Sequence, residues 1–117
     1  MQVFILDDNR ELGEFLVQVL AENGVEAESA TTLEATLKRF DAQRFDALIV
    51  DSTLEKTDGV AATERIRAAK FGKAVPALLM SDFDTALARR IAQNAKCEFI
   101  AKPFGLTPFV EQVRALR

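Results

Sequence analysis

Segments with two kinds of hydrophobic pattern alternate along the chain. Short segments of strand length, either wholly apolar or alternating apolar and polar, are each followed by a stretch in which apolar residues recur every three or four positions. The strand-like segments are residues 3–6, 25–29, 47–50, 76–80 and 99–101. The pattern therefore predicts five strands, each followed by a helix.

Two of the predicted helices can be described in more detail. The fourth is expected over residues 85–94, with Leu87 and Ile91 facing inward because they are its largest apolar residues at helical spacing. Before the fifth, Thr107 is expected to be the N-cap and Pro108 the first helical residue, a position that proline favours. In the turn before the fifth strand, Asn94 is the residue expected to tolerate a left-handed conformation best.

The predicted strands are apolar on both faces where they are clearest. Residues 47–50 form a continuous apolar run, which is typical of a strand covered by helices on both sides. Alternating strands and helices of this kind favour an α/β fold with a doubly wound parallel sheet. No linker, repeat or low-complexity tract interrupts the pattern, so residues 1–117 are expected to form one domain.

Composition and charge exclude several classes of protein. The chain has 117 residues, 49% of them hydrophobic, and 15 Lys and Arg against 18 Asp and Glu give a net charge of −3. No overall attraction to nucleic acid or to an anionic membrane is expected from this balance. No apolar run approaches the roughly 20 residues of a membrane span. The first apolar segment is too short for a signal peptide.

The residues that are missing narrow the chemistry further. The sequence contains no His and a single Cys, Cys97, so Ser-His-Asp and Cys-His nucleophile arrangements and His/Cys zinc sites are excluded. One Cys forms no internal disulfide, which agrees with a reducing cytoplasm. A packing role for Cys97 is favoured over a redox role. Any reaction must use carboxylates, hydroxyls and amines.

Polar residues stand at the carboxyl ends of the predicted strands. Asp7 and Asp8, Asp51, Ser81 and Lys102 stand at the carboxyl ends of four strands, where ligands bind in such sheets. Three carboxylates at one edge repel each other unless a cation joins them or one takes up a proton. All-oxygen ligation favours Mg²⁺, Mn²⁺ or Ca²⁺, and few carboxylates beside a phosphate suit Mg²⁺. With a Lys and a hydroxyl, the set suits phosphoryl transfer to an Asp nucleophile.

Each of these residues also has a simpler explanation. Asp8 or Asn9 could cap the first helix, Asp51 could be a strand-end residue, and Lys102 could be a solvated charge. The ordered occurrence of all of them, each after a predicted strand, favours a functional site.

The chain resembles a response-regulator receiver domain of two-component signalling across essentially its whole length. The residues that carry the resemblance are Asp7-Asp8, Asp51, Leu54, Asp58, Gly59, Ser81 and Lys102-Pro103-Phe104. The resemblance implies a flavodoxin-like parallel sheet of five strands in the order 2-1-3-4-5. It also implies a signalling phosphoacceptor, which assists its own phosphorylation and dephosphorylation but has no separate substrate, rather than an enzyme.

The resemblance assigns a phosphoryl acceptor and a metal site. Asp51 would accept a phosphoryl group from the phosphohistidine of a histidine kinase or a histidine phosphotransfer protein. Asp7 and Asp8 would hold Mg²⁺ together with Asp51 and the backbone carbonyl of Thr53. A Mg²⁺-dependent phosphatase with an Asp nucleophile is disfavoured, because Thr53 stands where such an enzyme has its general acid.

It also assigns the groups that respond to phosphorylation. Lys102 would pair with the phosphoryl group, and Ser81 would move towards it and hydrogen-bond to one of its oxygens. Phe99 stands at the aromatic switch position, three residues before Lys102. The Lys102–Pro103 peptide is expected to be cis.

The implied output is a shift between inactive and active conformations, read on the face of the fourth helix, fifth strand and fifth helix. A homodimer through this face is possible, whereas direct nucleic-acid or membrane binding is not expected, and the implied location is the cytoplasm. The alternative is a docking module with the same fold that works without phosphorylation. The residues leave open whether the domain stands alone or belongs to a longer regulator or hybrid kinase.

Two residues depart from the family pattern next to the acceptor. Asp82 occupies a position usually held by a small residue, and is expected to repel or partly block anionic small-molecule phosphodonors. Phe83 is expected to shield an aspartyl phosphate from water and so to slow its hydrolysis.

Overall fold

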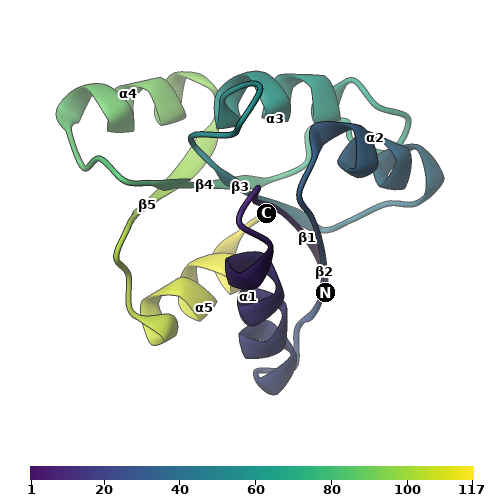
Figure 1. Ribbon diagram of the computed structural model, residues 1–117, viewed down its shortest axis with the longest axis horizontal. Helices are drawn as coiled ribbons and strands as arrows, with labels where there is room; N and C mark the ends of the chain where they lie inside the picture. Colours follow the sequence, from purple (N-terminus) through teal and green to yellow (C-terminus); the bar gives the residue numbers. More distant parts are fainter.

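Five parallel strands form the central sheet of the computed structural model, which describes residues 1–117 (Figure 1). The strands are β1 (Gln2–Leu6), β2 (Glu26–Ala30), β3 (Ala47–Asp51), β4 (Ala77–Ser81) and β5 (Cys97–Ala101). Their order in the sheet is β2-β1-β3-β4-β5, as the resemblance implied. β2 and β4 each begin one residue later than the sequence pattern predicted, whereas β1 begins one residue earlier and β5 two residues earlier.

Five helices cover the sheet on both faces; the first four connect consecutive strands, and the fifth follows β5. They are α1 (Arg10–Glu22), α2 (Leu33–Ala42), α3 (Gly59–Arg67), α4 (Ala86–Asn94) and α5 (Leu106–Ala115). Figure 1 shows α1 and α5 together on one side of the sheet, with α2, α3 and α4 on the other. The predicted doubly wound α/β fold is therefore confirmed.

The core is divided by the sheet into two apolar clusters. Along β1, Val3 and Ile5 belong to the cluster under α1 and α5, whereas Phe4 and Leu6 belong to the one under α2 and α3. Side chains alternate between the two faces of a strand, so a strand covered on both sides is apolar at every position. This packing explains the continuous apolar run that predicted β1.

The inward orientation predicted for Leu87 and Ile91 on α4 is wrong. Leu87 is 66% exposed and Ile91 is 46% exposed, while Ala92 is the residue that α4 buries. Small side chains let a helix approach a sheet closely, so this helix packs through alanine and leaves its larger residues at the surface. The prediction failed because it was based on the largest apolar residues of the segment.

The predicted start of α5 is also wrong. Its N-cap is Gly105, without a side-chain cap, and Pro108 lies in the first turn rather than at the first position. Proline is tolerated there because the first-turn N–H groups have no partner within the helix. The rings of Phe104 and Phe109 stack with centroids 5.1 Å apart, across the N-cap. This is a hydrophobic staple, which fixes the entry of the chain into the helix.

The left-handed residue between α4 and β5 is Lys96, with φ 56°, rather than Asn94. The guanidinium of Arg67 donates hydrogen bonds to the carbonyl oxygens of Ala95 at 2.6 Å and Lys96 at 2.9 Å. It also donates to the carbonyl oxygen of Val75. These contacts from α3 stabilise the turn, and local residue preference does not reveal them.

Candidate functional site

The carboxyl ends of four strands bring the predicted site residues to one edge of the sheet. Asp7 follows β1, Asp51 ends β3, Ser81 ends β4 and Lys102 follows β5. β3 lies between β1 and β4, so Asp51 is central in this row. Asp8 follows Asp7 directly and is exposed.

An ion pair joins Lys102, at one end of the site, to the central Asp51. The Nζ atom of Lys102 donates to Oδ1 of Asp51 at 3.0 Å, and their side chains are 19% and 8% exposed. The alternative in which Lys102 is a solvated charge is therefore wrong. The Lys102–Pro103 peptide bond is cis, as expected. Burial raises the pKa of Asp51, the hydrogen bond and charge of Lys102 lower it, and the charges of Asp82 and Asp8 raise it further.

Asp7, Asp8 and Asp51 form an acidic cluster. Each offers a carboxylate oxygen, and these atoms lie within 4.8 Å of one another. Asn9 is the N-cap of α1 and accepts from the Leu12 N–H, so capping does not occupy Asp8. Carboxylate oxygens so close to one another suit a divalent cation with oxygen ligands.

The side chain of Asp7 is buried with one oxygen unsatisfied. Oδ1 accepts a hydrogen bond from the Asn9 N–H at 2.9 Å, whereas Oδ2 is buried without a partner. Burial raises the pKa of Asp7, the bond from Asn9 opposes this, and the charge of Asp51 adds to the rise. An orphaned buried carboxylate oxygen next to two more carboxylates fits a site built for a cation.

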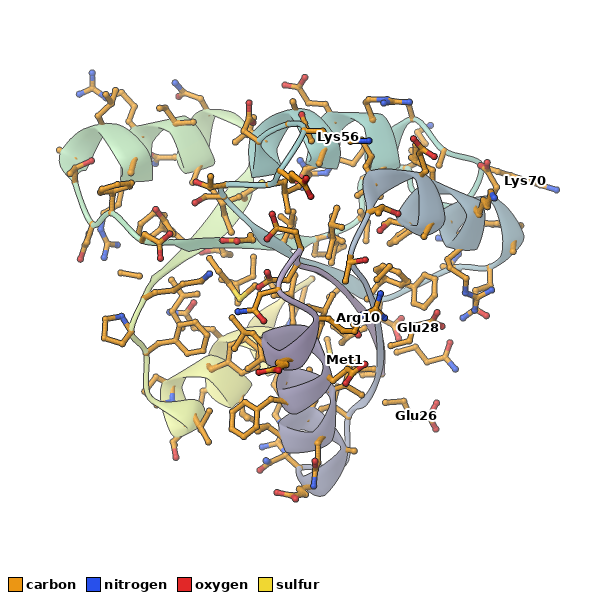
Figure 2. All side chains as sticks on the ribbon, in the orientation of Figure 1. Met1, Arg10, Glu26, Glu28, Lys56 and Lys70 are labelled. Carbon is orange, nitrogen blue, oxygen red and sulfur yellow. The ribbon has the colours of Figure 1, made fainter.

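The loop after Asp51 is held together by backbone contacts between its own residues. The Leu54 N–H donates to the carbonyl oxygen of Thr57 at 3.0 Å, and Thr53 forms an isolated antiparallel bridge with Asp58. The side chain of Asp58 then caps α3 by accepting from the Ala61 N–H. Lys56, labelled beside α3 in Figure 2, lies at the exposed tip of this loop. The loop holds Thr53, whose carbonyl was assigned to the metal site, two residues from Asp51.

Gly59 allows the start of α3 to lie directly against Asp51. A Cβ atom at Gly59 would overlap the backbone carbonyl oxygen of Asp51 and lie 2.7 Å from Cδ1 of Leu79. Only glycine fits this close approach without a shift of the backbone.

Ser81 is at the site, but its hydroxyl is bonded elsewhere. Its Oγ accepts from the Phe83 N–H at 3.1 Å and donates to the Phe83 carbonyl oxygen at 2.9 Å. Asp82, between them, is exposed, and its charge acts on Asp51. The Phe83 ring is 67% exposed.

Arg89 is a residue that the sequence did not assign to the site. Its guanidinium carbon lies 4.7 Å from the centroid of the Phe99 ring, and the guanidinium also pairs with Asp84. The two charged residues are five positions apart and span the loop and the helix, so helical spacing gives no signal for the pair. Phe99 itself is partly buried on β5.

Cys97 has the packing role that the sequence favoured. It is a free thiol, 8% exposed, in the cluster under α2 and α3. Burial raises the pKa of this thiol, while the charge of Arg67 lowers it. The effect of burial is the larger one, so the pKa of Cys97 is raised overall and the reactive thiolate is disfavoured.

The sequence is similar to those of known response regulators. The family model "Response regulator receiver domain" matches residues 3–114. The chain is 28% identical over 117 residues to Response regulator MprA of Mycobacterium avium (strain 104) and to that of Mycobacterium leprae (strain TN), with 99% of this chain and 50% of each relative covered. The chain thus spans about half the length of these relatives.

Solved structures show the same fold. A putative response regulator from Chloroflexus aurantiacus J-10-fl has a TM-score of 0.87 at 29% identity, covering 97% of this chain and 94% of that one. Chemotaxis protein CheY4 of Vibrio cholerae has a TM-score of 0.90 at 19% identity, covering 99% and 98%.

A third solved structure contains a metal ion. It is the receiver domain of sensor histidine kinase PA1611 from Pseudomonas aeruginosa PAO1, with a magnesium ion coordinated in its active-site cleft. Its TM-score is 0.83 at 23% identity, covering 97% of this chain and 94% of that one.

In the present structure, none of the helices has both the length and the apolar character that a membrane crossing requires.

Proposed function

Because this chain belongs to the response regulator receiver domain family of two-component signalling, we propose that Asp51 accepts a phosphoryl group from a phosphohistidine. The observation that supports this most is the Lys102–Asp51 ion pair, 3.0 Å long, beside the acidic cluster of Asp7, Asp8 and Asp51. Asp51 supplies a carboxylate nucleophile, and Lys102 beside it supplies a cation for the phosphoryl oxygens. Receiver domains are signalling domains and not classical enzymes.

The proposed reaction moves one phosphoryl group between two proteins or domains. A carboxylate oxygen of Asp51 attacks phosphorus, and the bond from phosphorus to the histidine nitrogen breaks. The electron pair of that bond stays on the imidazole, and Asp51 becomes an acyl phosphate. The 117 residues contain no His, so the phosphohistidine is supplied from outside them, by the histidine-bearing domain of a histidine kinase or of a phosphotransfer protein.

The residues present fit a magnesium ion. The carboxylates of Asp7, Asp8 and Asp51 and the carbonyl of Thr53 would hold it, and the unpartnered Oδ2 of Asp7 supports this assignment. When bound, Mg²⁺ neutralises negative charge that develops on the phosphoryl oxygens.

The other groups of the site bind the transferred phosphoryl group. Lys102 already donates to Asp51 and carries the charge that a phosphoryl oxygen requires. Ser81 is buried at the end of the neighbouring strand and can donate one hydrogen bond after it leaves Phe83. The phosphorylated form therefore differs from the unphosphorylated form in the β4–α4 loop.

The output of the switch is proposed to lie on the α4-β5-α5 face. Phosphorylation biases a two-state equilibrium in which Phe99 changes orientation, and the face is read in the cytoplasm by a docking partner or a second copy of the chain. The three elements carry charged residues of both signs: Arg89, Arg90, Glu98, Glu111 and Arg114. Arg114 donates a hydrogen bond to the carbonyl oxygen of Asn23 at the end of α1, and Arg117 follows α5.

A docking module that works without phosphorylation is the second candidate. The observation that favours this candidate is the charge of Asp82 near Asp51. This charge raises the pKa of Asp51, in addition to the effect of burial. Such a module would bind its partner equally well whether or not the acceptor is intact.

Transfer from a phosphorylated histidine protein separates the two candidates. We expect intact-mass measurement to show the gain of one phosphoryl group, dependent on Mg²⁺ and lost in Asp51→Asn. Asp41→Asn, on α2 and away from the site, is the matched control and should still be phosphorylated. Absence of transfer to the wild type from any histidine partner that docks on it would favour the docking module.

A further inference from the structure

The Ser81 hydroxyl cannot serve a phosphoryl group and the loop at the same time. Its single proton is donated to the Phe83 carbonyl oxygen at 2.9 Å, and its oxygen accepts from the Phe83 N–H at 3.1 Å. A serine hydroxyl has only one proton to donate. Breaking the bond to the Phe83 carbonyl is therefore a condition for Ser81 to bind a phosphoryl oxygen on Asp51.

The loop is held a second time at the next residue. Asp84 accepts two hydrogen bonds from Arg89, from Nε at 2.6 Å and from Nη2 at 3.2 Å. Two parallel bonds between a guanidinium and a carboxylate fix both the distance and the orientation of the partners. Arg89 lies in α4, which starts after the N-cap Thr85, so the pair binds the loop to the helix that follows it.

Arg89 is itself fixed from the other side by β5. Its guanidinium carbon lies 4.7 Å from the centroid of the Phe99 ring, within the range of a cation–π contact. Phe99 is paired in the sheet with Leu79 of β4, two residues before Ser81. The contacts thus form a continuous series, Ser81–Phe83–Asp84–Arg89–Phe99. It begins on β4 and ends on the neighbouring strand β5.

Resting on the phosphoryl transfer proposed above, we propose that Arg89 is a positioning residue that keeps Ser81 bonded to Phe83 in the unphosphorylated protein. Arg89 does this by holding Asp84, and with it the adjacent Phe83 backbone, against α4 and β5. When Ser81 moves to a phosphoryl oxygen, Phe83 and Asp84 must move too, and Arg89 loses its fixed position over Phe99. Conversely, removal of Arg89 makes the Ser81 hydroxyl easier to release.

Arg90 provides a matched control. It is the next residue of the same helix, it is exposed, and it has neither a hydrogen bond nor an ion pair with another side chain. Arg90→Ala changes net charge and helix composition as Arg89→Ala does, but it leaves the series of contacts intact. Arg89→Lys keeps a cation near Asp84 and Phe99 but loses the two-bond geometry.

The Phe83 amide reports the state of Ser81 directly, because it donates to the Ser81 hydroxyl. Hydrogen exchange of this amide, followed by NMR in the unphosphorylated protein, should be slow in the wild type and fast in Ser81→Ala. We expect Arg89→Ala to speed it on the order of tenfold, the combined effect of an exposed ion pair and an exposed cation–π contact. Arg89→Lys should lie between, and Arg90→Ala should match the wild type.

Phosphorylation supplies the second readout. With acetyl phosphate as donor, Arg89→Ala should react several times faster than Arg90→Ala, whereas the thermal midpoints of the two variants should differ little. Exchange of the Phe83 amide that is equal in Arg89→Ala and Arg90→Ala would overturn the proposal. The exchange measurement needs no phosphoryl group. Faster exchange in a protein that takes up no phosphoryl group, either from acetyl phosphate or from a phosphorylated histidine protein, would therefore support Arg89 as a positioning residue and count against the proposed function alone.

Discussion

A Cβ atom on Gly59 would occupy the space of the backbone carbonyl oxygen of Asp51. The first residue of α3 thus lies against the backbone of the proposed phosphoryl acceptor. Any side chain at this position must displace either the helix or the end of β3, and the acceptor carboxylate moves with that strand.

Gly59→Ala is expected to destabilise the fold by about 2 kcal/mol, the usual range for overpacking a tight contact. It should also slow phosphoryl transfer, because Asp51 shifts relative to Lys102. Chemical denaturation and the transfer rate measure the two effects. The control is Gly13→Ala in α1, where a Cβ would make an ordinary contact of 3.4 Å with Ser29 and alanine favours the helix. Equal stability of the two variants would show that the contact with Asp51 is not restrictive.

Asp7→Asn is expected to stabilise the protein in a chelator at neutral pH, by about 1 kcal/mol. Burial raises the pKa of Asp7 in the folded state, so holding its charge opposes folding at neutral pH. That penalty disappears as pH falls through the raised pKa. The wild type should therefore gain stability on acidification, and the advantage of the variant should shrink.

Magnesium should remove the stability advantage of Asp7→Asn over the wild type. We expect Mg²⁺ to raise the thermal midpoint of the wild type more than that of Asp7→Asn, because a ligand that binds only the folded protein stabilises it. Thermal unfolding with and without Mg²⁺ tests this. Equal shifts in both proteins would exclude Asp7 from the metal site.

Asp82→Ala is expected to react about twofold to fivefold faster with acetyl phosphate, in line with removal of one exposed charge near the acceptor. The charge of Asp82 acts on Asp51 in the folded protein. Asp82→Asn separates charge from size, since it removes only the charge. A rate for Asp82→Ala no higher than for the wild type would contradict the role assigned to this carboxylate.

Phe83→Ala is expected to shorten the lifetime of the acyl phosphate, because a bulky ring that excludes water protects a reactive group. Both bonds to Ser81 come from the Phe83 backbone, so the substitution leaves them in place. The half-life of the phosphorylated protein after removal of the donor is the measurement. An unchanged half-life would agree with the 67% exposure of this ring in the unphosphorylated structure and would count against shielding.

The strands and the residues at their ends could be predicted from the sequence because both depend on local order. A buried parallel strand is apolar at each position, and the polar residue that follows it marks the sheet edge. Asp7, Asp51 and Lys102 could therefore be assigned to one site, although Asp7 and Lys102 lie 95 positions apart in the chain.

The features that the sequence did not predict depend on contacts between distant segments. α4 packs through Ala92 rather than Leu87, and Lys96 takes its left-handed conformation in a turn held by Arg67. The contact of Arg89 with Phe99 joins a helix to the neighbouring strand. Only the staple of α5 had a local signal, since Phe104 precedes the N-cap Gly105 directly and Phe109 follows it by four positions.

The position of the phosphoryl group is the central test of phosphoryl transfer to Asp51. After transfer from a phosphorylated histidine protein, borohydride reduces an acyl phosphate to an alcohol, which converts an aspartate into homoserine. Peptide mapping by mass spectrometry then identifies the modified residue. We expect homoserine at position 51 alone, and none in Asp51→Asn. Modification at position 7 or 8, or its persistence in Asp51→Asn, would contradict phosphoryl transfer to Asp51.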